Sequence, residues 1–64
     1  MKRLVPARTV TRQIRDLEIG EEMEILFTEK YPHLVKAIAR KLSNENMGFE
    51  IHLTDNSTII KKLF

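Results

Sequence analysis

The chain has 64 residues, no cysteine and a net charge of +2. This length supports one domain over residues 1–64, with a small core and little stability in reserve. The composition excludes disulfides and thiolate metal sites, and no apolar run reaches the roughly 20 residues of a membrane span, so we expect a cytoplasmic protein outside membranes.

Charge is distributed in blocks along the chain. Residues 1–15 carry +5, residues 16–29 carry −6, residues 30–41 carry +4 and residues 42–64 carry −1. Such blocks give a folded protein separate electrostatic fields. They equally allow the basic and acidic segments to face each other and cancel in the fold.

The first third of the chain predicts an arm followed by two strands. Residues 1–8 contain a proline and little periodicity, so we expect a flexible basic arm. Residues 9–14 hold β-branched side chains in rough alternation, which favours a short strand. Gly20 indicates a turn. Residues 22–27 then show the period of two that is typical of a half-buried strand.

Residues 31–43 carry the clearest helical pattern. Pro32 is tolerated only in the first turn of a helix, which places the start of the helix near residue 31. Residues 44–48 include two asparagines and Gly48 and predict its end. The apolar residues of this segment fall on one broad stripe: Leu34, Val35, Ile38, Ala39 and Leu42.

Residues 49–64 predict a hairpin, with turn-forming residues at 55–57. A three-residue loop pairs Thr54 with Thr58 and turns Ile59 toward the core. A two-residue loop shifts the return strand by one position and turns Ile59 outward. We favour the three-residue loop because a one-residue slip exposes the apolar set of the return strand.

These elements predict an α+β fold: a small antiparallel sheet with one helix packed on one face, in the order β-β-α-β-β. The sheet has three or four strands, depending on residues 9–14. The favoured register sets Glu50 opposite Lys62, a favourable cross-strand pair. It leaves Ile60 and Phe64 on the uncovered face, and this exposed apolar surface favours a homodimer.

No catalytic or metal-binding constellation is visible in the sequence. His33 and His52 lie on different predicted elements and lack the spacing of metal ligands. Glu21, Glu22 and Glu24 lie on a turn and a strand with no apolar pocket that would make one of them a general acid. We therefore expect no enzymatic activity, no cofactor and no metal.

The predicted helix presents a basic face. Lys36 and Arg40 are four residues apart and project together opposite the apolar stripe, with Lys41 at its edge. Arg12 and Arg15, together with the cations of the arm, extend this basic surface. A helix face of this kind can lie against a phosphate backbone. The same residues are more often found on a plain solvated helix face.

The run IRDLEIGE at residues 14–21 resembles the "IRDLxxGE" opening of many short proteins from tailed bacteriophages. In those proteins a short strand, a helix rich in Arg, Lys and Ala, and a final hairpin follow, so the likeness covers residues 12–64. The chain departs from the pattern at Ser57, where glycine is common, and at residues 61–62, where an aromatic residue and arginine are frequent. The resemblance implies a small viral accessory protein of the host-cell cytoplasm. Regulatory or DNA-binding roles are the usual assignment for such proteins, and the resemblance implies no mechanism.

Three functions fit these residues. The leading hypothesis is a small phage-type regulatory or nucleic-acid-binding protein, acting as a homodimer through the basic helix face. The second is a protein-interaction module that inhibits a host or defence protein through the sheet edge or the acidic segment 18–24. The third is a dimeric sponge that sequesters an anionic nucleotide signal between basic residues. Binding held by phosphate contacts should weaken steeply with salt.

Overall fold

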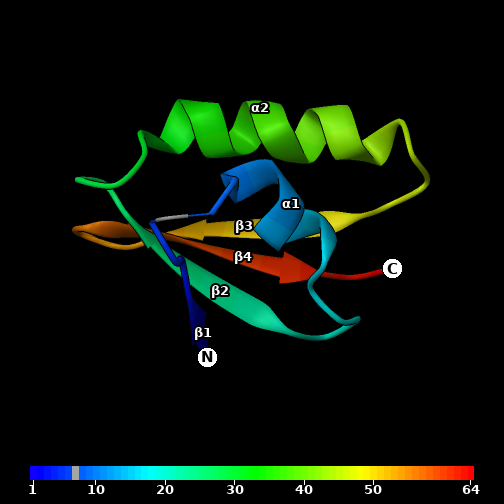
Figure 1. Cartoon of the computed structure of the whole chain (residues 1–64), viewed down its shortest axis with the longest axis horizontal. Coiled ribbons are helices and arrows are strands. Elements are labelled where there is room, and N and C mark those ends of the chain that lie inside the picture. The colour runs from blue at the N-terminus through cyan, green and yellow to red at the C-terminus, as the bar shows by residue number, and fades with distance from the viewer. Residues whose placement is uncertain (7) are drawn as a thin grey trace.

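The computed structural model describes residues 1–6 and 8–64. A four-stranded sheet in the order β1-β2-β4-β3 carries both helices on one face (Figure 1). The α+β class, the long helix and the C-terminal hairpin are confirmed. The elements follow one another as β1 (Lys2–Arg3), α1 (Val10–Arg15), β2 (Glu22–Leu26), α2 (Pro32–Ser43), β3 (Phe49–Leu53) and β4 (Ser57–Lys62).

Residues 9–14 do not form the predicted strand, because Val10–Arg15 is the helix α1. Val10 and Ile14 are one helical turn apart, and both pack in the core. The end of the helix is capped from β4, where Lys62 Nζ donates a hydrogen bond of 2.9 Å to the Arg15 carbonyl. A helix of this length is unstable by propensity alone. Tertiary packing therefore overrides the β-branched composition that favoured a strand.

Residues 1–6, where we expect a flexible arm, contact the sheet and the helices, and residue 7 lies outside the described residues. β1 pairs in parallel with β2, so the sheet is mixed rather than purely antiparallel. Leu4 is buried in the core. Gln13 binds both backbone groups of Val5: its Oε1 accepts the N–H at 2.8 Å and its Nε2 donates to the carbonyl at 2.9 Å. A two-residue strand has no periodicity, so the sequence pattern could not reveal it.

The helix α2 begins at a proline and ends before a left-handed residue, as predicted. Asn46, with φ of 65°, turns the chain toward β3. The buried side of α2 is narrower than the predicted stripe: Val35, Ala39 and Leu42 are buried, whereas Leu34 is 39% exposed. The opposite side of the helix is left to solvent.

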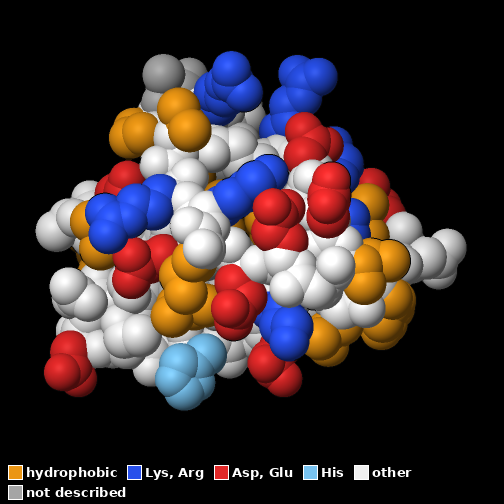
Figure 2. All heavy atoms as spheres, turned by 90° about the horizontal axis from the view of Figure 1, so that it is seen from below, with side chains coloured by type: hydrophobic (Ala, Val, Ile, Leu, Met, Phe, Trp, Pro, Cys, Tyr) orange, Lys and Arg blue, Asp and Glu red, His pale blue; other side chains and the backbone are white. Residues whose placement is uncertain are grey.

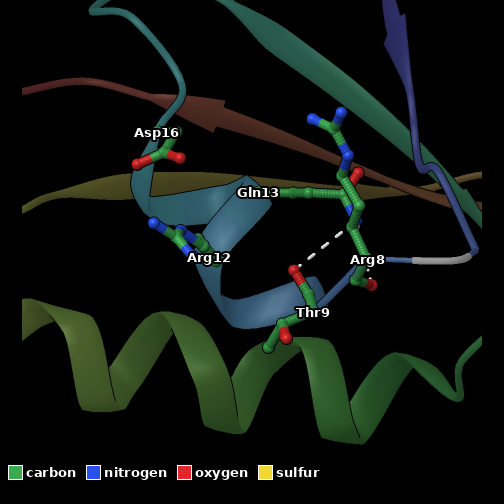
Figure 3. A pocket seen from close by; sticks show the side chains of 5 residues that line it. All are labelled: Arg8, Thr9, Arg12, Gln13 and Asp16. Atoms are coloured by element: carbon green, nitrogen blue, oxygen red, sulfur yellow. Dashed lines mark hydrogen bonds between the residues drawn. The ribbon is translucent and has the colours of Figure 1, made fainter.

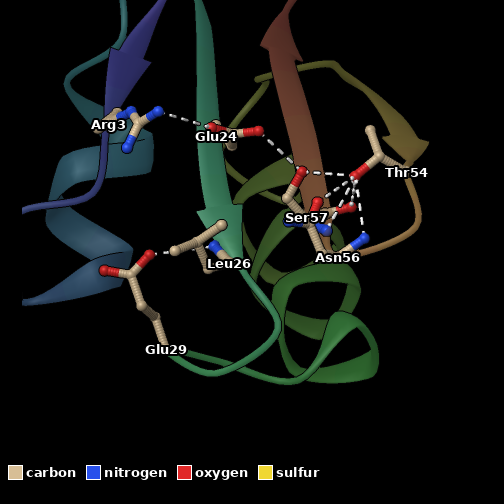
Figure 4. A network of polar contacts seen from close by, with 7 residues as sticks. All are labelled: Arg3, Glu24, Leu26, Glu29, Thr54, Asn56 and Ser57. Atoms are coloured by element: carbon tan, nitrogen blue, oxygen red, sulfur yellow. Dashed lines mark hydrogen bonds and ion pairs between the residues drawn. The ribbon is translucent and has the colours of Figure 1, made fainter.

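The hairpin closes through a two-residue loop, so the predicted three-residue loop is wrong. Leu53, not Thr54, lies opposite Thr58. The hydroxyl of Thr54 explains the tighter loop, because it accepts the N–H groups of Asn56 at 3.3 Å and Ser57 at 2.9 Å (Figure 4). A side-chain oxygen thus satisfies the turn, with no left-handed residue in the loop.

This register turns Ile60 rather than Ile59 toward the helices. Ile60 is fully buried between Met23 and Ile51, and Ile59 is half-buried on the other face of the sheet. We expected Ile60 and Phe64 to share the uncovered face of the sheet as an exposed apolar surface. This expectation is wrong, because Ile60 is buried. Two adjacent isoleucines let either register bury one of them, so the apolar pattern could not choose between the loops.

The face of the sheet away from the helices carries interleaved acidic and basic side chains (Figure 2). Lys61 lies between Glu22 and Glu50 in the strand register. It takes the place opposite Glu50 that we predicted for Lys62. This face therefore carries charges of both signs, with hydrophobic side chains between them.

The core lies between the sheet and the two helices. Thr58 on β4 is fully buried, and the Oγ1 of Thr58 has no hydrogen-bond partner among the described residues. An unpaired buried hydroxyl lowers stability. The buried apolar residues of the core are Leu4, Ile14, Leu17, Met23, Ile25, Val35, Ala39, Leu42 and Ile60.

Thr58→Val should stabilise the fold, because it removes the unpaired hydroxyl and keeps the branched shape. We expect the free energy of unfolding to rise by about 1 kcal/mol, measured by chemical denaturation. Thr54→Val is the matched control and should lower that free energy, since the hydroxyl of Thr54 accepts two turn N–H groups. A loss of stability in Thr58→Val would contradict the assigned register.

Acid should weaken the turn before β2. The Glu18 N–H donates a hydrogen bond of 2.9 Å to Glu21 Oε1, and with the nearby Lys2 ammonium it holds the pKa of Glu21 below its ordinary value of 4.5. The carboxylate therefore stabilises the fold above about pH 4.5, and this contribution is lost as pH falls through the lowered pKa. Melting curves from neutral pH to pH 3 should show a smaller acid-induced loss for Glu21→Gln than for the parent. Glu22→Gln, which removes an exposed charge, is the control, and equal curves for Glu21→Gln and the parent would contradict the assignment.

Candidate nucleic-acid interface

Positive charge is concentrated on the helix side of the molecule. We define the helix layer as residues 8–16 and 30–43, which contain α1 and α2 and lie on one face of the sheet (Figure 1). This layer has seven cations and one acid, whereas the remaining residues have four cations and eight acids. The helix layer itself is therefore strongly basic, although Glu45 at its border pairs with Arg15.

Lys36 and Arg40 form the outer face of α2. Both side chains are exposed, one helical turn apart, and they lie opposite the buried Val35 and Leu42. Neither makes an ion pair with any described residue. The structure thus places these two predicted residues together and leaves them open to a ligand.

Lys41 faces a different side of α2. It lies beside α1 and lines a groove of about 330 Å³ between the two helices, together with Thr11, Ala37 and Ile38. Leu34 and Lys30 line the same groove nearer the start of α2. Apolar and polar side chains therefore share the lining of this groove, which does not include Lys36.

Arg12 lies on the exposed side of α1, at a hollow of about 490 Å³ that is also lined by Arg8, Gln13 and Asp16 (Figure 3). Arg8 and Arg12 extend on either side of Gln13 in this view. Arg8 has a defined place because Gln13 Nε2 donates to the Arg8 carbonyl at 3.2 Å. We had assigned Arg8 to a mobile arm, and no sequence signal indicated that Gln13 would anchor it.

Arg15 differs from the other predicted contact residues. Its Nη2 lies 3.3 Å from Oε2 of Glu45, which follows the end of α2. This ion pair joins the ends of the two helices, so Arg15 has a structural partner. Its availability to a ligand is lower than that of Arg12.

Two other cations of the N-terminal segment are drawn to the sheet. Lys2 Nζ lies 3.4 Å from Glu21 Oε1, and Arg3 Nη2 lies 3.7 Å from Glu24 Oε1. The other oxygen of Glu24 accepts a hydrogen bond from the buried Ser57 hydroxyl at 2.9 Å (Figure 4). These contacts neutralise part of the acidic segment and remove Lys2 and Arg3 from the helix-side surface.

An exposed aromatic pair stands at the start of α2. The rings of Tyr31 and His33 are stacked, with centroids 5.8 Å apart and an interplanar angle of 10°. Tyr31 is 64% exposed. We did not predict this pair, and the signal that could have indicated it is the spacing of two rings on either side of Pro32 at the helix start.

The helix layer presents several exposed cationic side chains. Exposed arginine forks and lysines bind phosphate oxygens. No group of three or more potential metal ligands occurs in the described part of the chain. Within the same residues, no helix is long and apolar enough to cross a membrane.

Comparison with known proteins adds no relative. No family model matches the chain, and neither the curated proteins nor the solved structures contain a significant match. The function is therefore argued from the arrangement of the residues.

Proposed function

We propose that this protein binds the phosphate backbone of nucleic acid through the helix layer. The observation that carries the proposal is the charge of the helix layer, whose residues include seven cations and one acid, with Glu45 at its border paired to Arg15. A field of this kind attracts a polyanion and orients the protein as it approaches. A regulatory role in a tailed phage, which is the usual assignment for the proteins that the sequence resembles, belongs to the same proposal.

The expected contacts come from both helices. Lys36 and Arg40 on α2, Arg12 on α1 and Arg8 just before α1 make no ion pair with the described residues. Each can neutralise one phosphate without first losing an internal partner. Lys41 adds a charge in the groove between the helices. Contacts of this type position a nucleic acid without reading its sequence.

The alternative of a host-protein contact through the acidic segment 18–24 has less support. Glu21 and Glu24 are the half-buried acids of that segment, and both have cationic partners within the chain. A basic protein surface would have to displace Lys2 and Arg3 to reach them. The exposed charges of the helix layer present no such competition.

Neutralising the outer face of α2 should weaken binding to duplex DNA of random sequence. Four phosphate contacts predict roughly a hundred-fold loss of affinity between about 50 and 200 mM salt for the parent. The Lys36→Gln/Arg40→Gln double variant should bind more weakly, and its slope of log affinity against log salt should be shallower by about 2. Fluorescence anisotropy over a salt series measures both quantities.

Lys2→Gln/Lys61→Gln is the matched control, since it removes the same net charge from outside the helix layer. It should bind almost like the parent. Equal weakening of both double variants would show that only net charge matters and would contradict a defined interface. If the parent itself does not bind at low salt, the proposal fails, and binding of a protein partner becomes the next function to test.

A further inference from the structure

The outer edge of β3 offers unpaired backbone groups. β3 is the last strand of the sheet and pairs only with β4. The Thr54 N–H donates a hydrogen bond of 2.8 Å to the Ser57 carbonyl, so the backbone N–H of Thr54 points toward β4. Along a strand, successive residues point their N–H and C=O groups to opposite sides. The N–H and C=O groups of Phe49, Ile51 and Leu53 therefore point to the outer edge, away from β4. These groups have no partner among the described residues.

This edge lacks the usual protection against pairing. The opposite edge of the sheet is the two-residue strand β1, which carries Lys2 and Arg3. Short length and positive charge discourage strand pairing there. β3 is longer and contains neither lysine nor proline. Its apolar side chains are incompletely covered, since Leu53 is 45% exposed and Phe49 and Ile51 are half-buried.

The sequence of β3 is self-complementary about Ile51. When two β3 strands pair antiparallel, the outward N–H and C=O groups of one copy must face those of the other. Among pairings that overlap over most of the strand, this occurs only when the two-fold axis passes through residue 50, 51 or 52. An axis at Ile51 sets Glu50 opposite His52 of the second copy. It also sets Phe49 opposite the second copy's Leu53. Axes at residues 50 and 52 set Glu50 against Glu50 or His52 against His52, which lack this complementarity.

We propose that two copies of this chain associate through antiparallel pairing of their β3 strands, centred on Ile51. The partner is thus a second copy, recognised by backbone hydrogen bonds and by two symmetric Glu50–His52 contacts. An imidazole N–H donates to a carboxylate in either protonation state of the ring, so the contact does not require a charged histidine. Pairing also covers the exposed flank of Leu53.

The pairing produces one continuous sheet of eight strands. A two-fold axis perpendicular to the sheet leaves the helix layers of both copies on the same face. That face then carries twice the net charge of +6 that one helix layer holds. The inference does not rest on the proposed function, because strand pairing can be measured without nucleic acid.

The pairing is tested by two variants that change the charges at positions 50 and 52. Sedimentation equilibrium over a range of concentrations measures their association. Glu50→Lys places lysine opposite histidine in both contacts of the pair, and His52→Glu places two carboxylates opposite each other. Each variant alone should associate roughly ten- to thirty-fold more weakly than the parent. An equimolar mixture of the two should recover the parent's association, because one contact then joins lysine to glutamate and the other is the parent's histidine–glutamate contact.

Leu53→Pro tests the backbone contribution separately. Its N–H points to the outer edge, so proline removes a donor needed by the second copy and leaves the pairing with β4 intact. This variant should be monomeric and keep the parent's circular dichroism, whereas Leu53→Ala, which keeps the N–H, should still associate. A parent that is monomeric at all concentrations, or a mixture of the charge variants that does not recover, would overturn the proposal.

Discussion

β4 lies between β2 and β3, and its register against both neighbours is the constraint on which the other features depend. The Thr54 hydroxyl fixes this register by accepting the N–H groups of the turn. Ile60 then enters the core between Met23 and Ile51. At the far end of the strand, Lys62 reaches the last carbonyl of α1. This turn therefore determines which side chains of β4 face the helices, and it places Lys62 at the end of α1.

The same register sets the two surfaces that we assign to binding. It turns Glu22, Lys61 and Glu50 to the face away from the helices, where acids and bases alternate, whereas Lys62 points to α1. The helix layer is left with nearly unopposed positive charge. The register also decides which backbone groups of β3 point outward. The nucleic-acid interface and the self-pairing edge are thus consequences of one arrangement, although each can be tested without the other.

Sequence reasoning succeeded where a pattern was long and failed where a single contact decided. The twelve residues of α2 repeat their apolar spacing over several turns, so the helix and the outward direction of Lys36 and Arg40 could be predicted. The six residues of α1 are too few for a period, and their β-branched side chains favoured the wrong element. The adjacent Ile59 and Ile60 made the hairpin register ambiguous. The position of Arg8 depends on a hydrogen bond from the side chain of Gln13, five residues later, and the spacing of apolar residues does not encode such a contact.

Proton NMR measures the central constraint directly. Residues that face each other without mutual backbone hydrogen bonds in an antiparallel sheet bring their α-protons close together. The register described here predicts a strong nuclear Overhauser cross-peak between the α-protons of Ile51 and Ile60. A strong cross-peak from Ile51 to the α-proton of Lys61 instead would indicate the three-residue loop and would contradict the account of the core, the open face and the β3 edge.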